Sequence, residues 1–481
     1  MVLYKREFLL NIIFLFLANL LIKPYYIFFI EREFQNQAGT SNWGIYFTLF
    51  SLSMLPQIVL DLGMTSYVNR RVASHPSESN VIWSQTIWWR PVMAFVFTLI
   101  FLLLTFLGGY LNKYPEIILW IALNQILLSA ILFFRAYISG LGFYRTDSLF
   151  SIADKLLFIL LMFFSGMVLP MNQVSSFLII QSISLSLPCL AGLVWVLIKI
   201  KPPLSLPEFL FPLKILKECL PYAGVFILMV LFSRMEPVWI DLLREDGARQ
   251  SGLYAAAYRL LDAGNMMGFL FAGLLLPMFS NLLGRKDQPG LQSLFDLAWK
   301  LMTVSAILIA IPLAFYHRDI MQWLYEDSGE DVLYILILNL VPLTINYLLN
   351  TLLTAAALAR SMNRLFLLSI IFNATGHLLF THRYGALGAA WTALLTQLFT
   401  ALLLAGFIFH QKLINIRWWH LNGFIFSSIL AGIIGWGLQY VDLPPIYELL
   451  ILIGTTLLVL LLTGWIPLRS GYRLIFRSHP A

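Results

Sequence analysis

Nine charged side chains fall within stretches of this sequence that are otherwise apolar enough to lie inside a lipid bilayer. They are Lys23, Asp61, Arg135, Asp154, Lys155, Arg234, Glu236, Arg259 and Asp262. A charge at bilayer depth is unfavourable by roughly 2.5–3.5 kcal/mol on insertion scales, so these groups are expected to line a wet cavity or to pair with one another. Arginine offers phosphate a bidentate fork and lysine a point charge. Because the deep charges lean basic, the functional interpretation is a cavity that binds an anionic substrate.

A structural interpretation of the same charges is open at this point. Arg259 and Asp262 stand at i and i+3 and share one face of a helix. Arg234 lies two residues from Glu236, so each of these two pairs can neutralise itself and fix helix packing. Lys23 has no acidic residue nearby on its own helix and needs a tertiary partner or a ligand.

The remaining charges lie nearer to the predicted helix ends. Asp61, Asp154 and Lys155 can reach the membrane interface by snorkelling or pair there. Arg90 and Lys300 are interpreted as topology anchors. Uncharged polar residues also recur in the apolar stretches, where each can either hydrogen-bond a sugar hydroxyl or join two helices. They are Asn124, Gln125, Asn346, Asn350, Asn373 and His377.

The elements that must position these residues are transmembrane helices. Sixty per cent of the 481 residues are hydrophobic and 11% are charged, against roughly 25% charged residues in a typical soluble domain. A helix needs about 20 apolar residues to cross the hydrocarbon. The sequence predicts about fourteen such spans. They are 8–30, 41–63, 88–110, 117–139, 149–169, 175–198, 220–243, 252–279, 295–315, 332–356, 362–381, 386–408, 421–440 and 446–466.

The distribution of basic residues predicts the orientation. With the N-terminus in the cytoplasm, about 18 Lys and Arg residues fall on the cytoplasmic side and about 6 outside, which is the bias of the positive-inside rule. Both termini are therefore expected in the cytoplasm. The expected organisation is an N-lobe over residues 1–200, a cytoplasmic linker over 201–219, a C-lobe over 220–410, and two further helices with a tail over 411–481.

An internal repeat relates the first two predicted helices to the seventh and eighth. Lys23-Pro24 is followed by a polar loop and Trp43-Gly44-Ile45-Tyr46, and Glu236-Pro237 is followed by a polar loop and Ser251-Gly252-Leu253-Tyr254. Proline removes a backbone hydrogen bond and kinks a helix, so Pro24 and Pro237 are predicted kinks. Paired, proline-interrupted segments in two halves are typical of a transporter binding site.

Four stretches carry a resemblance to a known family. They are Lys23-Pro24 to Asp61-Leu62-Gly63, Arg135 through Asp147 to Asp154-Lys155, Ser233-Arg234 through Gly252 to Arg259 and Asp262, and Tyr384-Gly385-Ala386-Leu387-Gly388-Ala389-Ala390. In these stretches the chain resembles the bacterial polysaccharide-unit flippases of the MOP superfamily, which also includes MATE exporters and the lipid II flippase.

The resemblance implies an all-α polytopic membrane protein with two pseudo-symmetric six-helix lobes around a central cavity and two additional C-terminal helices. It also implies a flippase that moves polyprenyl-pyrophosphate-linked oligosaccharides across the bacterial inner membrane by alternating access. By this resemblance Lys23, Arg234 and Arg259 bind the pyrophosphate, and Arg135 and Lys155 are second choices. Glu236 stands where the family pattern leads us to expect an aspartate.

Further expectations concern partners and coupling. Glu236, Asp262, Asp61 and Asp154 are candidate charge partners or ion-coupling groups. Membrane lipids are expected partners, together with a polysaccharide polymerase and chain-length machinery. A monomer is sufficient for the pathway, and the sequence predicts no cofactor, metal site or nucleic-acid partner. It does not choose between a cation gradient and the membrane potential as the driving force, nor does it identify the sugar.

Two other function classes share some of these sequence features. A small-molecule or cation antiporter on the same fold would favour buried acids, whereas the deep charges here lean basic. A membrane glycosyltransferase or polysaccharide ligase could use Glu31-Arg32-Glu33 as a catalytic acidic pair, although a solvated loop explains these residues as well. Such enzymes usually hold their acceptor with a sizeable outside domain, and the predicted loops are short.

Overall fold

The structure is a computed structural model that describes residues 22, 24–165, 173–201, 213–327, 329–415, 418–438, 440 and 445–462. These residues are almost entirely helical and include no strand, which confirms the predicted all-α class. They divide into two compact units, with the boundary between Ala255 and Ala256. The four domain ranges proposed from the sequence stay predictions, as do the orientation of the termini and the total of about fourteen spans.

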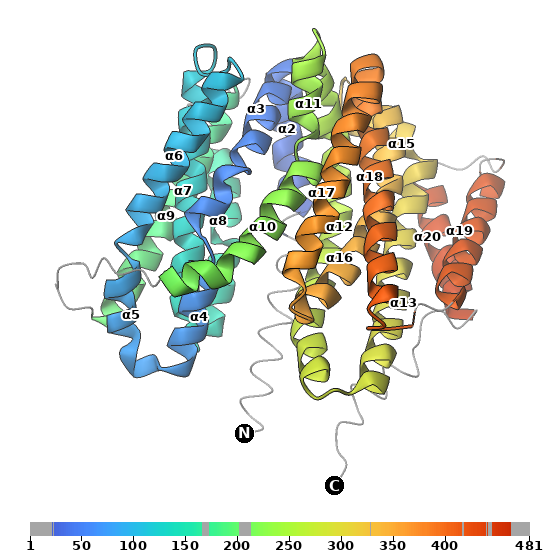
Figure 1. Cartoon of the computed structure of the whole chain (residues 1–481). Helices are drawn as coiled ribbons and strands as arrows, with labels where there is room; N and C mark the ends of the chain where they lie inside the picture. Colours follow the sequence, from blue (N-terminus) through green and yellow to red (C-terminus); the bar gives the residue numbers. More distant parts are fainter. Residues whose placement is uncertain are drawn as a thin grey trace. The chain divides into compact units, whose positions relative to one another are not determined.

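Among the residues that the structure describes, the N-terminal unit contains ten helices and the first turns of an eleventh (Figure 1). They are α2 (Arg32–Ala38), α3 (Thr40–Ser53), α4 (Met64–Ser74), α5 (Ser79–Thr86), α6 (Trp89–Leu107), α7 (Pro115–Gly140), α8 (Tyr144–Ser165), α9 (Val174–Ile200), α10 (Leu213–Ser233), α11 (Glu236–Leu243) and the start of α12 (Gly247–Gly284). A π-helical turn η1 (Tyr26–Glu31) precedes α2, and short 3-10 turns η2 (Pro56–Leu60) and η3 (Pro76–Glu78) flank α4. Helices α7, α8 and α9 lie side by side and form the body of this unit.

The first predicted outside loop is helical rather than irregular. The sequence predicts a span that ends at residue 30, with a polar loop after it. In the structure, η1 continues directly into α2, and Glu31, Arg32 and Glu33 lie within this helical stretch. The helix ends at Gly39, whose φ of +83° an L side chain rarely adopts. Glutamate, glutamine and arginine are strong helix formers, so polarity alone did not mark a loop here.

The second predicted span is broken in the middle. Helix α3 ends at Ser53, and the segment Pro56–Ser74 leaves it at an angle of 52°. Pro56 has no backbone N–H to continue the helix. At the far end of η2 the chain turns through Leu62 (φ +43°) and Gly63 (φ +81°) before α4 begins.

Arg90 binds the backbone at this break. Its Nη1 donates to the Leu60 carbonyl oxygen at 2.6 Å, and its Nη2 donates to Ser129 Oγ at 2.6 Å. The guanidinium carbon lies 4.9 Å from the centroid of the Phe133 ring. The interpretation of Arg90 as a topology anchor missed this role, because the carbonyl it binds is supplied by a helix break that was not predicted.

Replacing Arg90 by glutamine is expected to lower the free energy of unfolding by about 1–3 kcal/mol, since the Leu60 carbonyl loses its charged donor. Thermal denaturation of the purified protein in detergent measures the effect. Arg71→Gln is the matched control, because Arg71 pairs with Glu78 at 3.4 Å on the surface, with both side chains about half exposed, and such pairs contribute about 0–1 kcal/mol. Equal losses for the two variants would contradict the role assigned to Arg90.

The described part of the C-terminal unit contains the rest of α12 and eight further helices. They are α13 (Gln288–Phe315), α14 (His317–Leu324), α15 (Glu330–Leu338), α16 (Leu340–Ala355), α17 (Ala359–Gly376), α18 (His382–His410), α19 (Trp418–Leu438) and α20 (Pro445–Leu462), with a π-helical turn η4 (His377–Thr381) between α17 and α18. Helices α13, α16 and α18 pack together, and α19 and α20 pack on α13.

Helices α17 and α18 form an antiparallel pair. Asn373 Nδ2 donates to Thr396 Oγ1 at 3.2 Å, and Thr400 Oγ1 donates to Ser369 Oγ at 2.8 Å, so residues run in opposite directions along the contact. The reversal occurs near Gly385, whose φ of +57° and ψ of −130° are not helical. This glycine belongs to the Tyr384–Ala390 motif, which therefore has a backbone role at the turn between two helices.

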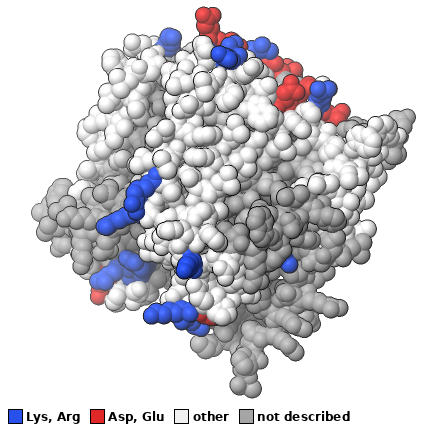
Figure 2. All heavy atoms as spheres, turned by 45° about the vertical axis from the view of Figure 1, so that its right-hand side comes forward, with Lys and Arg blue, Asp and Glu red and all other residues white. Residues whose placement is uncertain are grey.

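The helices present apolar side chains both inward and outward. On α6, Met93, Phe97 and Phe101 are buried at four-residue spacing, while Phe95 and Leu103 on the same helix are 64% and 55% exposed. Figure 2 shows a wide surface with few charged side chains. Among the described residues, seven helices are long and apolar enough to cross a membrane, or nine spans if each of two bent pairs counts as one. The chain is a multi-pass membrane protein.

Candidate functional site

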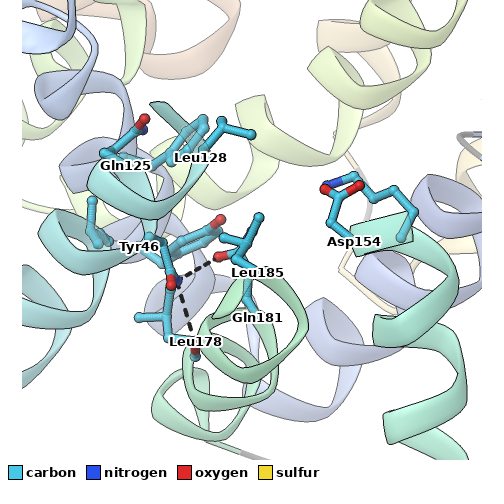
Figure 3. Close-up of a pocket in the computed structure, with 11 residues that line it drawn as sticks. Tyr46, Gln125, Leu128, Asp154, Leu178, Gln181 and Leu185 are labelled. Carbon is cyan, nitrogen blue, oxygen red and sulfur yellow. Dashed lines mark hydrogen bonds and ion pairs between the residues drawn. The ribbon is translucent and has the colours of Figure 1, made fainter. Parts of the chain in front are cut away.

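The N-terminal unit contains a pocket with an empty volume of about 360 Å³. Helices α3, α7, α8 and α9 supply its walls. It is lined by Tyr46, Phe50, Ile121, Asn124, Gln125, Leu128, Asp154, Lys155, Leu178, Gln181 and Leu185. Asp154 lies on one side of the pocket, and Tyr46, Gln125 and Gln181 lie together on the other (Figure 3).

One wall carries an ion pair. Lys155 Nζ lies 2.9 Å from Asp154 Oδ2, and the two side chains are 26% and 13% exposed. The Lys155 ammonium also lies 4.8 Å from the centroid of the Tyr26 ring, which is within the range of a cation–π contact. Both charged residues fall in the middle of α8 rather than near a helix end. The pocket, and not the membrane interface, therefore accounts for a charge pair at this position.

The opposite wall is a chain of carboxamides and hydroxyls. Asn124 Nδ2 donates to Gln181 Oε1 at 2.9 Å, and Ser182 Oγ donates to Asn124 Oδ1 at 2.6 Å. Gln125 Nε2 donates to Ser53 Oγ at 3.1 Å. Because these bonds fix the amide orientations, the side chains present a rigid set of donors and acceptors at the pocket.

Aromatic rings form the layer behind this wall. Tyr46 packs on Phe177 with ring centroids 5.5 Å apart and on Phe50 at 5.9 Å. Phe158 joins the same cluster at 5.2 Å from Phe177 and 5.1 Å from Tyr26. Edge-to-face and tilted contacts of this kind stabilise aromatic clusters beyond their burial. The pocket thus combines an ammonium for anionic oxygens, amides for hydroxyls and aromatic faces for apolar ring surfaces.

A second functional candidate is the contact between α3 and the first turns of α12. A Cβ atom added to Gly44 would overlap the Ala248 carbonyl oxygen and lie 2.6 Å from the Gly252 nitrogen. A Cβ atom on Gly252 would overlap the Thr40 carbonyl oxygen in turn. The contact is reciprocal, as at a twofold axis, because the equivalent residues of the predicted repeat meet each other. Gln35 Nε2 adds a hydrogen bond to the Gly252 carbonyl oxygen at 3.2 Å.

Helix α11 is bound to the same end of the unit. Thr48 Oγ1 and Ser251 Oγ both donate to the Pro237 carbonyl oxygen, at 3.3 Å and 3.0 Å. Tyr110 OH donates to Asp241 Oδ2 at 2.6 Å. Burial, together with this bond and the negative charge of Asp241, raises the pKa of Tyr110, so its phenol stays protonated and remains a donor. These bonds join α3, α11 and α12 where the repeat motifs converge.

Several other predicted site residues lie outside the pocket lining. Arg135 Nε pairs with Asp147 Oδ1 at 2.7 Å. Asp61 accepts a hydrogen bond from the Thr65 backbone N–H at 2.9 Å and another from the Thr65 hydroxyl, and so caps the first turn of α4. Arg135 and Asp61 therefore have local structural partners.

The remaining predicted residues lie at helix breaks or on α12. Arg234 lies two residues before the start of α11, and Glu236 and Pro237 form the first turn of that helix, where α10 and α11 meet at 46°. Arg259 (9% exposed) and Asp262 lie on the part of α12 that belongs to the C-terminal unit. Pro24 lies just before η1 and is half-buried, while Lys23 lies outside the described residues.

Sequence reasoning missed Gln181, Ser182 and Gln57, which complete the polar chain around the pocket. Gln57 Nε2 donates to Gln125 Oε1 at 3.1 Å from the break after α3. A glutamine within the apolar run 175–198 was the signal that could have indicated Gln181. Within the described ranges, no cluster of three His, Cys, Asp or Glu residues is placed to hold a metal ion.

The comparison with protein families gives one match. Residues 8–283 match the family described as "Polysaccharide biosynthesis protein". This range covers more than half of the chain and includes three of the four stretches that carry the resemblance. No curated protein matches the sequence.

Solved structures match the fold at low sequence identity. An inward-facing multidrug resistance MATE transporter of the MOP superfamily superposes with a TM-score of 0.66 at 12% identity, over 81% of this chain and 94% of that one. The lipid II flippase MurJ in an inward closed conformation gives 0.63 at 16% identity, over 98% and 100%. A mutant of a Vibrio cholerae MATE transporter gives 0.59 at 16% identity, over 86% and 98%. These likenesses confirm the predicted MATE-like fold.

Proposed function

The chain belongs to the polysaccharide biosynthesis protein family, and we propose from this membership that it is a flippase for polyprenyl-pyrophosphate-linked oligosaccharide repeat units. The repeat units serve surface polysaccharide synthesis, and the membrane is the bacterial inner membrane. The pocket of the N-terminal unit carries this proposal. It brings Lys155, buried carboxamides and aromatic rings together, and these groups suit a phosphate-bearing saccharide.

The substrate passes through the protein by alternating access. The cationic side chains Lys23, Arg234 and Arg259 receive the pyrophosphate, and Lys155 contributes to the same recognition. The carboxamides of Asn124, Gln125 and Gln181 exchange hydrogen bonds with sugar hydroxyls. The lipid tail stays in the membrane, so only the polar head needs a protein environment to replace its water.

Complementation tests the function. We expect the wild-type chain to restore surface polymer in a bacterial strain that lacks its own polysaccharide-unit flippase, when the strain makes a repeat unit that the protein accepts. The intracellular pool of lipid-linked repeat units should fall as surface polymer appears. Because the sequence does not identify the sugar, the test uses a series of strains that make different repeat units. If no strain in the series regains polymer although the protein is inserted, the flippase assignment is wrong.

The same assay separates a flippase from a membrane glycosyltransferase or ligase. Alanine replacements at Glu31, Arg32 and Glu33 are expected to leave export largely intact, because these residues lie in a helical stretch outside the pocket lining. Complete loss of polymer with a normally folded triple variant, and with no trapped lipid-linked units, would favour the enzyme instead.

A further inference from the structure

The polar wall of the N-terminal pocket has a counterpart in the C-terminal unit. In the pocket, Asn124 on α7 donates to Gln181 on α9 at 2.9 Å. In the C-terminal unit, Asn346 Nδ2 on α16 donates to Gln397 Oε1 on α18 at 2.7 Å and to the backbone carbonyl oxygen of the same glutamine at 2.9 Å. Helices α16 and α18 pack on each other as α7 and α9 do. An asparagine–glutamine pair therefore joins two packed helices in each unit.

The residue after each asparagine forms a second matching bond. Gln125 Oε1 accepts from Gln57 Nε2 at 3.1 Å, and Tyr347 OH accepts from Asn265 Nδ2 at 3.1 Å. Both donors, Gln57 and Asn265, lie eleven residues after the tyrosine that ends a motif of the predicted repeat. The repeat therefore extends from short motifs to a shared pattern of side-chain contacts.

One position of this pattern differs in polarity between the two units. Leu128 lies four residues after Asn124 and lines the N-terminal pocket. Asn350 lies four residues after Asn346, so both residues stand on one face of α16. The C-terminal unit thus has a carboxamide where the N-terminal pocket has an apolar side chain. The C-terminal polar cluster consists of Asn265, Asn346, Tyr347, Asn350 and Gln397.

Three oxygens of the C-terminal polar cluster are buried and have no hydrogen-bond partner among the described residues. They are the Oδ1 atoms of Asn265, Asn346 and Asn350. Asn265 and Asn346 are only 6% and 3% exposed. In the N-terminal pocket, by contrast, the carboxamide oxygens of Asn124 and Gln125 both accept hydrogen bonds within the chain. Because a buried acceptor without a donor is unfavourable, three in one cluster indicate that a bound molecule supplies the donors.

Sugar hydroxyls suit the chemistry of this cluster. The amide of Asn346 already donates to Gln397, and the amide of Asn265 donates to the tyrosine hydroxyl, so the groups left over are acceptors. A sugar ring presents several O–H donors close together, whereas phosphate oxygens at neutral pH mainly accept. The rings of Tyr347 and Phe269, with centroids 6.4 Å apart, add an aromatic surface for the apolar face of a sugar.

Gly268 keeps space open beside the cluster. It lies on α12, three residues after Asn265, and is buried. A Cβ atom there would lie 3.4 Å from Tyr347 Cδ2, 3.6 Å from Thr344 Oγ1 and 3.7 Å from Asn265 Oδ1, which are ordinary contact distances. A larger side chain at this position would therefore occupy the space next to an acceptor that has no donor within the described chain.

We propose that the C-terminal polar cluster is a second saccharide-binding site, which accepts hydrogen bonds from sugar hydroxyls of the repeat unit. This inference rests on the proposed function and names the part of the substrate that the C-terminal unit recognises. The asparagine oxygens accept from the hydroxyls, and the Tyr347 ring contacts the apolar face of the sugar. Recognition at this site needs no charged side chain.

Binding of two purified lipids tests the inference. The probes are the lipid-linked repeat unit that accumulates in the flippase-deficient strains and the same polyprenyl pyrophosphate without sugar. Native mass spectrometry of the full-length protein in detergent measures both affinities. We expect Asn350→Leu to weaken binding of the sugar-bearing lipid about three- to tenfold, as the loss of one hydrogen bond does, and to leave the sugar-free lipid unaffected. Its thermal midpoint should not fall, because leucine replaces an acceptor that has no donor within the described chain.

A second variant keeps every polar group and fills the space instead. Gly268→Leu is expected to weaken binding of the sugar-bearing lipid at least about tenfold, again without an effect on the sugar-free lipid. Gly273→Leu is the matched control on α12, because a Cβ there meets no described atom within 4 Å. It should bind both lipids like the wild type.

The outcomes separate this inference from the proposed function. If the wild type restores surface polymer but Asn350→Leu and Gly268→Leu bind both lipids normally, the cluster holds only water and this inference alone is wrong. Equal weakening of both lipids would show that the cluster does not recognise the sugar, and would also overturn it. If no strain regains polymer and the wild type binds neither lipid, the proposed function fails and this inference fails with it.

Discussion

Replacing Lys155 by glutamine is expected to reduce surface polymer at least about tenfold and to leave lipid-linked repeat units inside the cell. The change removes the ammonium from the pocket and leaves Asp154 partly buried without its ion-pair partner. Truncating one partner of a buried, hydrogen-bonded charge pair costs about 2–5 kcal/mol, and each 1.4 kcal/mol of lost binding is about tenfold. Surface polymer and the pool of lipid-linked units are the two measurements.

The matched control is Lys199→Gln. Lys199 also lies over an aromatic ring, at 5.1 Å from the Phe143 centroid, but it is exposed and does not line the pocket. We expect this variant to export normally. Full export by Lys155→Gln would show that Lys155 does not contribute to substrate binding.

A double variant separates recognition from folding. If Lys155 serves only to neutralise Asp154, then Asp154→Asn combined with Lys155→Gln should recover export, because no unpaired charge is left. If Lys155 binds the substrate, the double variant should stay defective although its thermal stability recovers. The comparison of the two single variants with the double variant therefore isolates the contribution of the ammonium.

Substituting Gly252 by leucine is expected to produce the largest structural effect. The new Cβ would overlap the Thr40 carbonyl oxygen, which is backbone and cannot rotate away, so α3 and α12 would have to separate. Separation would also stretch the bond from Gln35 to the Gly252 carbonyl. Overpacking of a tight contact costs about 1–3 kcal/mol or more. Thermal denaturation in detergent should show a fall of several degrees, together with a loss of export.

Two further variants test the reciprocity of this contact. Gly44→Ala should destabilise in the same direction, because its Cβ would overlap the Ala248 carbonyl oxygen. Combined with Gly252→Ala, the effect should be less than additive, since one separation of the helices relieves both overlaps. Gly406→Ala is the control, because a Cβ there meets nothing within 4 Å on the helix α18. A Gly252 variant as stable as the Gly406 variant would show that α3 and α12 can separate without a loss of stability.

Much of the architecture could be predicted from residue order. The predicted span 252–279 lies within α12, and 295–315 lies within α13, because long apolar runs leave few alternatives to a membrane helix. The family was also predictable. The match over residues 8–283 includes the Ser233–Asp262 stretch of the resemblance. The Tyr384–Ala390 motif lies outside that match. The non-helical backbone at Gly385 accounts for the glycine at that position of the motif.

The errors concern breaks and helix ends. The sequence predicts a loop after residue 30, where α2 continues, and an unbroken helix over 41–63, where α3 ends at Ser53 and Pro56 begins a separate turn. The role of Arg90 was missed because of the second error, since the Leu60 carbonyl becomes available as an acceptor only at the break. Hydropathy reports how apolar a segment is and says little about where its backbone bonds are interrupted.

Composition, apolar run length and local motifs determined that this chain is an all-α, multi-pass membrane protein of the polysaccharide biosynthesis family, because these properties depend on each segment alone. The place of the Asp154–Lys155 pair in the wall of a pocket, the alignment of Asn124 with Gln181, and the contact of Gly44 with Gly252 were decided only by the tertiary structure. The Asn124–Gln181 and Gly44–Gly252 contacts each join helices that are far apart in sequence. The orientation of the Asp154–Lys155 pair depends on the pocket around α8. Helix packing sets these distances, and no spacing along the chain encodes them.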